Sequence, residues 1–415
     1  MSSVQVHVIS KHDNAQHTVF QLEEEAIPLA ESSVRVRTFL ISLTSNNLTY
    51  ARGGTRFGWW DAYPVPQSAP PPYNSQSEWG IVSAWGYGRV VESKVTSIIS
   101  GSLLWGMWPT SSHAVDLQLE ATMPTGHWCE VSKHRKGLMT VYNNYEQYPA
   151  SGATKDKERM AMTCLWKPLW VASHLLNLSV FSAPPNLHPL GLGDHWSEED
   201  SDLSLAVVIS LSASSKTGRN FSWQLAKNRN NASKGPLALL QLTSAPEVMR
   251  DYPESALAVK AARYEEFASL TGWVADFRPT RIVIVDFGAA VSNTKSIASI
   301  AAAIASSVSI IAVGYEAKIY SSDELKEHSE SSQILKKVQL NTSGLRDRTK
   351  EAVGIDEFYG ALEETWERWI EDGGSKGVSL RQMKGVRGRD GIEGAWQDLC
   401  DRRVAPDTGI VITLP

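Results

Sequence analysis

The clearest chemical signal in the sequence is a turn of small hydroxylated residues between an apolar run and a helical pattern. Leu205 to Ile209 is continuously apolar and rich in β-branched residues, which predicts a strand buried on both faces. Ser212 to Gly218 forms the turn, and Phe221 to Ala226 resumes with helical spacing. A helix that begins after such a turn offers N–H groups to a phosphate. The stretch predicts a nucleotide site, but it holds no GxGxxG, so a structural unit without ligand is about as well supported.

The elements around this turn predict a parallel sheet. Four apolar runs alternate with helical stretches, at 205–211, 237–242, 281–286 and 309–313. Strands that alternate with helices are typical of a doubly wound sheet, in which right-handed crossovers bring the carboxyl ends of the strands to one edge. Met160 to Leu178 predicts an apolar helix interrupted at Pro168. We therefore expect any ligand of this half at that edge of the sheet.

The first part of the chain predicts β-structure. Residues 4–8 and 34–39 alternate between apolar and polar side chains, as half-buried strands do. The Pro-, Gly- and Trp-rich passage 53–80 predicts a long loop, which is either a wall of a substrate site or a cover for a sheet edge. Glu357 to Glu371 predicts an amphipathic helix, 373–389 a mobile segment, and 409–414 a strand that returns to the first domain.

Composition narrows the classes of function. The 415 residues suggest two or three domains, and the net charge of -5 gives no basic footprint for nucleic acid. The basic run at 133–136 predicts a solvated turn. Three scattered cysteines indicate a reducing compartment. Neither a signal peptide nor an apolar run of 18 residues is apparent, so we expect a cytoplasmic protein without a membrane partner.

The order of elements resembles the medium-chain dehydrogenase/reductase superfamily, on its quinone-oxidoreductase side. The similar segments are 35–54, the glycine-rich 85–93 and the closing 392–414. The motifs 46–51, 59–61, 79–80, 85–87, 91–93, 142–145 and 212–217 resemble, more specifically, a little-characterised family of fungal and bacterial proteins of unknown function. The resemblance implies an α/β fold with a GroES-like β domain at 1–150, completed by 345–415, and a Rossmann doubly wound parallel-sheet domain at 151–344.

The resemblance also implies a dinucleotide site. Ser214, Ser215, Lys216 and Thr217 would meet a pyrophosphate, with Lys216 as a point charge. NAD-specific proteins place a carboxylate after the second Rossmann strand, but Thr243 and Ser244 stand there instead. With Arg250 they could hold a 2′-phosphate, so the resemblance favours NADPH over NADH.

The candidate catalytic residues are polar groups that could steady a developing enolate. Residues 42–49 and 78–87 hold neither Cys nor His, and His113, His127 and His134 lack metal spacing, so no metal site is expected. A Tyr hydroxyl or an Asn amide would then act on the substrate oxygen. The candidates are Tyr50 first, then Asn46, Tyr142 and Tyr145, although each residue type is more often structural.

Three functions remain open at this stage. The first is a zinc-independent, NADPH-dependent reductase of an enone or carbonyl in a hydrophobic small molecule, plausibly in secondary metabolism. The second is a non-redox isomerase, dehydratase or cyclase on the same fold, with the cofactor lost or structural. The third is a binding protein without chemistry, which 15 tryptophans permit. Many members of the superfamily are dimers through the Rossmann edge strand, which makes a homodimer one option.

Overall fold

The structure is a computed structural model, and it describes residues 3–24, 27–149, 156–182, 184–192, 196–229 and 235–415. The chain divides into two compact units. Unit 1 comprises 1–168, 317–319 and 379–415, and unit 2 comprises 169–316 and 320–378. The domain boundaries expected from the family resemblance divide the chain differently and remain a prediction.

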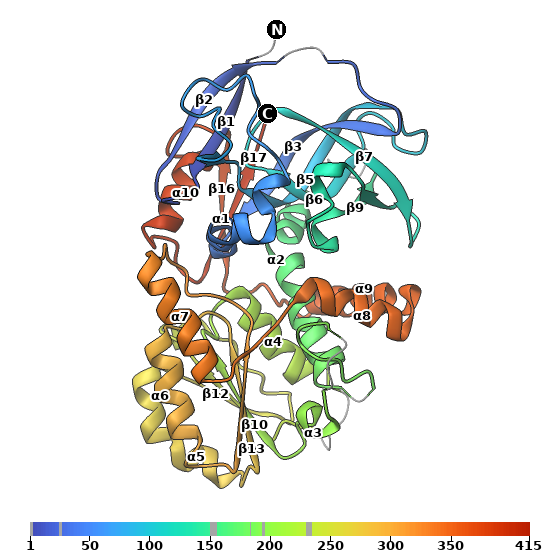
Figure 1. Ribbon diagram of the computed structural model, residues 1–415. Helices are drawn as coiled ribbons and strands as arrows, with labels where there is room; N and C mark the ends of the chain where they lie inside the picture. The colour runs from blue at the N-terminus through green and yellow to red at the C-terminus, as the bar shows by residue number, and fades with distance from the viewer. Residues whose placement is uncertain (1–2, 25–26, 150–155, 183, 193–195, 230–234) are drawn as a thin grey trace. The chain divides into compact units, whose positions relative to one another are not determined.

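Unit 1 is built mainly from β-strands (Figure 1). Its elements are β1 (Ser3–Ser10), β2 (His17–Glu23), β3 (Ser33–Leu43), α1 (Ser45–Phe57), η1 (Trp59–Asp61), β4 (Trp79–Gly80), β5 (Ser83–Ser93), β6 (Leu103–Pro109), β7 (Ala114–Thr122), β8 (His127–Glu130), η2 (Lys133–Arg135), η3 (Thr140–Asn143), β9 (Asn144–Tyr148), β16 (Ser379–Lys384), α10 (Ile392–Cys400) and β17 (Thr408–Thr413). Helix α2 (Lys157–Leu175) begins in unit 1 and continues into unit 2.

The large sheet of unit 1 closes on itself. Its strand order is β16-β17-β3-β5-β6-β9-β8-β7, and β7 pairs again with β3. Strands β3, β5, β6, β9, β8 and β7 therefore form a barrel, and β17 and β16 extend it from β3. Because a closed barrel leaves no free edge along these six strands, the sheet is protected against edge pairing. This barrel is the GroES-like β domain of the expected fold class, which is confirmed.

Glycines let the strands of the barrel approach closely. A Cβ atom on Gly86 of β5 would lie 2.0 Å from the carbonyl oxygen of Leu40 on β3, and one on Gly106 would lie 2.4 Å from the Tyr145 ring. In the glycine-rich segment 85–93, Gly86 and Gly88 are explained in this way, because a Cβ atom there would collide with the Leu40 backbone or the Trp108 ring.

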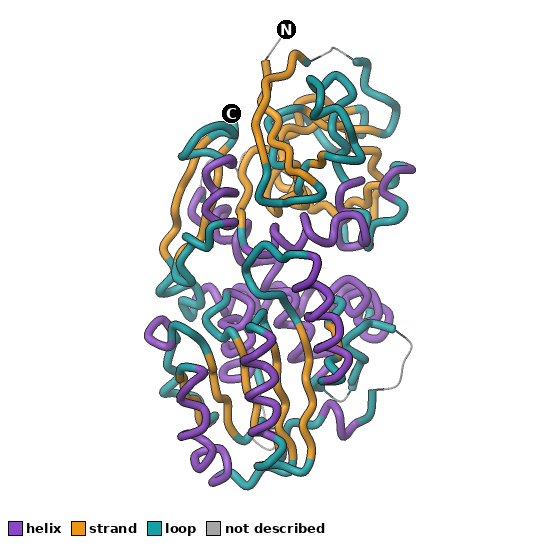
Figure 2. Tube along the Cα trace, turned by 60° about the vertical axis from the view of Figure 1, so that its left-hand side comes forward, coloured by secondary structure: helices purple, strands orange, loops and turns teal. Residues whose placement is uncertain are grey.

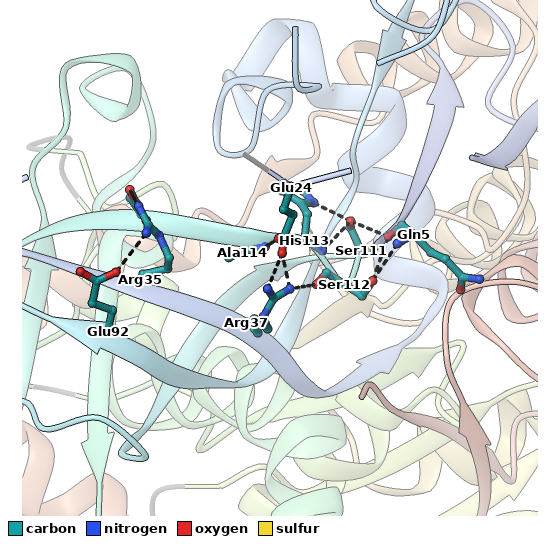
Figure 3. Close-up of polar contacts among 10 residues, drawn as sticks. Gln5, Glu24, Arg35, Arg37, Glu92, Ser111, Ser112, His113 and Ala114 are labelled. Atoms are coloured by element: carbon teal, nitrogen blue, oxygen red, sulfur yellow. Dashed lines mark hydrogen bonds and ion pairs between the residues drawn. The ribbon is translucent and has the colours of Figure 1, made fainter. Parts of the chain in front are cut away.

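Polar contacts fix β3 to its neighbours at the side of the barrel shown in Figure 3. Arg37 of β3 forms an ion pair with Glu24 and donates to the carbonyl oxygen of Ser112 at 2.9 Å. Glu24 also accepts from the backbone N–H of Ala114 at 2.7 Å. Since Glu24 follows β2, this carboxylate ties the end of the small sheet β2-β1-β4 to the barrel.

Unit 2 contains the parallel sheet (Figure 2). Its elements are η5 (Leu176–Val180), α3 (Glu198–Ser201), β10 (Ala206–Leu211), α4 (Lys216–Lys227), β11 (Ala238–Leu242), η7 (Pro246–Val248), β12 (Ala258–Ala262), η8 (Tyr264–Leu270), α5 (Thr271–Asp276), β13 (Arg281–Asp286), α6 (Val291–Ala301), β14 (Ser307–Ala312), α7 (Ser322–Ile334), β15 (Val338–Gln339), α8 (Thr342–Val353) and α9 (Ile355–Glu371).

The strand order of this sheet is β12-β11-β10-β13-β14-β15, and the pairings are all parallel. This is the 3-2-1-4-5-6 order of a Rossmann fold, with a switch point between β10 and β13 where ligands bind. Alternate residues of β10, β11 and β13 share one core with η8, α5 and α6. The predicted doubly wound sheet and its four predicted strands are thereby confirmed.

Some local expectations were wrong. Residues 53–57 belong to α1 rather than to the long loop, and α2 continues through Pro168 without interruption. The segment 373–389, expected to be mobile, contains β16, which pairs with β17 along its whole length. The returning strand was correct, because β17 pairs with β3.

Candidate functional site

The small-residue turn of unit 2 connects β10 directly to α4, as the sequence predicted. Ser212 has a φ of 52°, in the left-handed region that favours glycine. The Ser215 side chain caps α4 by accepting from the N–H of Gly218 at 3.1 Å, and the helix begins at Lys216. The first turn of α4 holds no acidic residue. The positive end of the helix dipole is therefore not compensated by the helix itself.

Gly218 is the one glycine of the turn, and it has a packing role. A Cβ atom at this position would lie 2.8 Å from the carbonyl oxygen of Ala213. Close packing of helix against strand is the role of the last glycine in a dinucleotide-binding turn. The turn thus has the backbone shape of such a site even though serines replace the other glycines.

Hydroxyl groups join the turn to the next two strands. The Ser214 and Thr243 hydroxyl groups lie 2.6 Å apart, and both side chains are buried. The Tyr264 hydroxyl accepts from the backbone N–H of Ser212 at 2.7 Å. The sequence interpretation found Ser214 and Thr243 but missed Tyr264. The pairing of β11 with β12 aligns Leu242 with Ala262, so the residues that follow both strands are neighbours.

Two arginines lie near the end of β11, and they have different partners. Arg263, which follows β12, donates to the carbonyl oxygen of Ser244 at 2.5 Å and pairs with Glu247 at 3.2 Å. Arg250 instead pairs with Asp372 at 3.1 Å. Sequence reasoning named Arg250 and missed Arg263, which is therefore a further candidate for a 2′-phosphate.

The residues at this edge fit a phosphate-bearing dinucleotide. The turn has the required backbone shape, the first turn of α4 has no carboxylate, and Lys216 stands at its first position. A cationic side chain and a helix N-terminus are the groups that hold phosphates in proteins. One feature limits the fit: the Ser215 hydroxyl already satisfies one N–H group of the helix.

The candidate catalytic residues lie in unit 1, and three of them form one cluster. Asn46 and Tyr50 are one turn apart on α1, and the Asn46 amide donates to the Tyr50 hydroxyl at 2.9 Å. The Trp85 indole donates to the same oxygen at 2.9 Å. The ring centroids of Tyr142 and Tyr50 are 5.8 Å apart. The structure therefore brings Asn46, Tyr50 and Tyr142 together.

The two donors determine what the Tyr50 hydroxyl can do. A phenol oxygen has two lone pairs and one proton, and the N–H groups of Asn46 and Trp85 use both lone pairs. The third hydrogen bond of the hydroxyl, with Tyr142, therefore uses the Tyr50 proton. Burial raises the pKa of Tyr50 to about 12, although the hydrogen bonds with Trp85, Tyr142 and Asn46 oppose the rise. At neutral pH Tyr50 is thus a protonated hydrogen-bond donor.

Tyr145 belongs to a different buried cluster. Its hydroxyl accepts from Arg135 at 2.8 Å and lies 3.0 Å from the Tyr63 hydroxyl. Arg135 also donates to the carbonyl oxygen of Ala62 at 3.1 Å, and it is buried, which corrects the expectation of a solvated turn at this residue. This cluster fixes the chain that follows η1. The η1 residue Trp59 packs against Tyr50, with their ring centroids 5.0 Å apart.

Of the histidines named from the sequence, His134 adjoins Arg135 of the Tyr145 cluster, whereas His113 lies in the polar group at the end of β6. His113 is buried, with its Nδ1 atom 2.5 Å from the Ser111 hydroxyl, which donates to the carbonyl oxygen of Gln5 at 2.9 Å (Figure 3). Burial lowers the pKa of His113 to about 4. Among the described residues, no group of three His, Cys, Asp or Glu side chains is arranged to hold a metal.

The described helices include none that is long and apolar enough to span a membrane.

Comparison with known proteins links the chain to one family and one fold. The sequence profile of a family described as "Protein of unknown function (DUF2855)" matches residues 41–405. A search of curated proteins found no match.

Several solved structures share the fold. A mutant enoyl thioester reductase from Candida tropicalis is 12% identical to this chain, with a TM-score of 0.55. The match covers 100% of both chains. CurA in complex with NADPH, from Vibrio vulnificus, is 10% identical with a TM-score of 0.52 and 99% coverage of both chains. The CurF ER cyclopropanase of the curacin A pathway is 14% identical with a TM-score of 0.51 and the same coverage. At these identities the likeness shows the fold alone, which is that of the medium-chain reductases.

Proposed function

Because the chain belongs to the DUF2855 family, whose function is unknown, we propose an activity from its own residues: NADPH-dependent reduction of an enone or carbonyl in a hydrophobic small molecule. The observation that carries this proposal is the buried Tyr50 hydroxyl, whose lone pairs both accept N–H groups and whose O–H group would exchange its hydrogen bond with Tyr142 for one to a substrate oxygen. The fold adds support, since a solved neighbour is described in complex with NADPH.

The turn after β10 would hold the cofactor. The N-terminal turn of α4 and Lys216 would bind the pyrophosphate, and the hydroxyl groups of Ser214, Ser215 and Thr217 would line it. Thr243, Ser244 and either Arg263 or Arg250 would receive the 2′-phosphate. When bound, the nicotinamide supplies the hydride.

Tyr50 would act on the substrate oxygen. Its O–H group would donate to the carbonyl oxygen as negative charge develops there. Stabilisation of such charge in the transition state is usually the largest single contribution to lowering the activation barrier. Asn46 and Trp85 would hold the hydroxyl in a fixed orientation, so no reorientation is needed during the reaction. Tyr142 would support the Tyr50 ring, while a catalytic role for Tyr145 has less support because its hydroxyl is already used by Arg135 and Tyr63.

The test is a titration with NADPH and NADH, followed by nicotinamide fluorescence and thermal stability. We expect saturable micromolar binding of NADPH, weaker binding of NADH, and loss of NADPH binding in Lys216→Ala. A screen of enone substrates would follow. With a substrate in hand, we expect Tyr50→Phe to lower kcat by about 10²-fold without weakening the binding of NADPH, as expected for the loss of one hydrogen-bond donor to the oxyanion.

Absence of binding by both cofactors would overturn the reductase proposal. The second candidate would then apply, a cofactor-free isomerase, dehydratase or cyclase. The bond between Ser214 and Thr243 and the cap by Ser215 favour it, since these hydroxyl groups are already engaged within the protein. A non-catalytic binding protein is the third candidate.

Several finer points belong to the proposal as well. Zinc independence rests on the sequence of 42–49 and 78–87, which lack Cys and His. A hydrophobic substrate, with a place in secondary metabolism, rests on the Trp-rich passage 53–80, and a cytoplasmic location on the three scattered cysteines. A homodimer rests on the family resemblance.

A further inference from the structure

Unit 1 carries a surface pocket that shares no residue with the Tyr50 cluster. The pocket has a volume of about 700 Å³ and is formed by the start of β2, the loop before α10, α10 itself and the loop after it. Figure 1 shows α10 beside β1 and β2. The lining residues are His17, Gly388, Arg389, Glu393, Gly394, Gln397 and Arg403. A volume in the range of roughly 300–1,000 Å³ is typical of small-molecule sites.

Three guanidinium groups converge on one carboxylate beneath this pocket. Asp398 is buried, with 1% of its side chain exposed, and it accepts from Arg389 at 2.6 Å, from Arg381 at 2.6 Å and from Arg403 at 2.8 Å. Asp398 and Asp401, which also pairs with Arg403, neutralise two of the three guanidinium groups, so one positive charge remains. Arg389 uses one terminal nitrogen for Asp398, and 59% of its side chain is exposed.

The surrounding segment is locally basic although the whole chain is acidic. Residues 381–403 hold six basic residues, namely Arg381, Lys384, Arg387, Arg389, Arg402 and Arg403, and four acidic ones, namely Asp390, Glu393, Asp398 and Asp401. The acidic member of the lining, Glu393, accepts from the backbone N–H of Gly388 at 2.6 Å. This hydrogen bond holds the Glu393 carboxylate at the Gly388 end of the pocket.

A hydrogen-bond chain holds the opposite wall of the pocket. The Gln397 side-chain oxygen lies 3.0 Å from His17 Nε2, and an amide oxygen can only accept, so His17 Nε2 is the donor. His17 Nδ1 then accepts from His7 Nε2 at 3.0 Å. Gln397 donates in turn to Asp401 at 3.0 Å, and Asp401 pairs with Arg403 at 2.6 Å. This series of hydrogen bonds fixes the position of the Arg403 guanidinium before any ligand binds.

We propose that this pocket binds an organic phosphate, with its phosphate group held between Arg389 and Arg403. Guanidinium groups bind phosphate oxygens in a forked geometry. Arg389 uses only Nη1 for Asp398 and would offer Nε and Nη2 as a fork, whereas Arg403, whose Nε and Nη2 hold Asp398 and Asp401, would add one bond from Nη1. Gly388 and Gly394 lack side chains, which leaves room for the organic part. The pocket is far larger than an inorganic phosphate, which is why an organic phosphate is the assigned class. This proposal is independent of the reductase proposal.

Isothermal titration calorimetry at constant ionic strength tests the proposal with AMP, inorganic phosphate and adenosine as probes. We expect AMP to bind, inorganic phosphate to bind more weakly, and adenosine not to bind. Arg389→Gln and Arg403→Gln should each weaken AMP binding by at least about 10-fold. Arg389→Lys, which keeps the charge but removes the fork, should lie between Arg389→Gln and the parent protein.

Two matched variants make the result specific. Arg348→Gln removes an exposed arginine that pairs with Glu351 on α8, and AMP binding should not change. Lys216→Ala removes the charge of the dinucleotide turn, and AMP binding at the pocket should persist. The proposal is overturned if AMP fails to bind, if adenosine binds equally well, if Arg389→Gln binds like the parent, or if Lys216→Ala abolishes binding.

Discussion

At the scale of single residues, the chemistry of a side chain depends on which of its atoms the protein already uses. Tyr50 and Tyr145 are both buried tyrosines, yet the Tyr50 hydroxyl has only neutral partners, Asn46, Trp85 and Tyr142, whereas the Tyr145 hydroxyl accepts from the Arg135 guanidinium. Sequence alone could not separate them, because the difference arises from partners that are distant in the chain. Trp85 lies 35 residues from Tyr50.

The two arginines near Ser244 lead to a prediction at the same scale. If Arg263 holds the 2′-phosphate, Arg263→Gln should weaken NADPH binding by about 10- to 100-fold, the loss expected for a charge-assisted hydrogen bond. NADH binding should change little, because NADH lacks the phosphate. Fluorescence titration measures both constants.

Arg250→Gln is the matched variant for this test. Because Arg250 pairs with Asp372, we expect the ratio of NADPH to NADH affinity to stay near that of the parent. If the ratio of NADPH to NADH affinity changes in Arg250→Gln and not in Arg263→Gln, the 2′-phosphate is bound by Arg250, as the sequence indicated.

At the scale of elements, patterned segments were predictable and unpatterned ones were not. The apolar runs of β10 and β13 identified buried parallel strands. Strand β16 was missed because its sequence, SLRQMK, has no apolar run and lies at the outer edge of its sheet. The last part of α1 was hidden by Gly53 and Gly54, which are typical of loops but here pack against Trp59 and Trp60. Tertiary packing decided both cases.

Two glycines allow a test of how the elements of each unit are packed. Gly86→Ala places a Cβ atom against the Leu40 carbonyl oxygen, and we expect a loss of stability of about 3 kcal/mol, since β3 and β5 must separate. Gly360→Ala lies inside α9 with no atom within 4 Å of the added Cβ, and it should raise stability by about 0.5–1 kcal/mol. Urea unfolding followed by circular dichroism measures both. Equal effects of the two variants would contradict the packing of β5 against β3.

At the scale of the whole molecule, buried histidines make stability depend on pH. Burial lowers the pKa of His174 to about 4, below its ordinary value of 6.5, so the unfolded chain binds the proton more readily than the folded protein. The free energy of unfolding should therefore fall as the pH decreases from about 6.5 toward 4, and His174 should account for about 2 kcal/mol by pH 5.

His174→Gln tests this dependence. His174 Nδ1 lies 3.1 Å from the Thr365 hydroxyl, and a glutamine amide can preserve that contact without titrating. We expect the slope of stability against pH, from urea unfolding between pH 7.5 and 5, to become shallower. An unchanged slope would mean that His174 does not contribute.

The barrel of unit 1 also has a consequence for the time at which the protein can fold. Strand β3 ends at Leu43, yet its neighbour β17 begins at Thr408, and β16 reaches the sheet only through β17. A ribosome that adds about 5–20 residues per second needs roughly 20–70 s to pass from one strand to the other. During synthesis residues 40–43 of β3, which pair with β17, have no partner there from this chain, whereas the strands of the Rossmann sheet emerge in one continuous stretch. The nascent protein should thus complete its parallel sheet first, and a chaperone that shields strand edges would be needed earliest at β3.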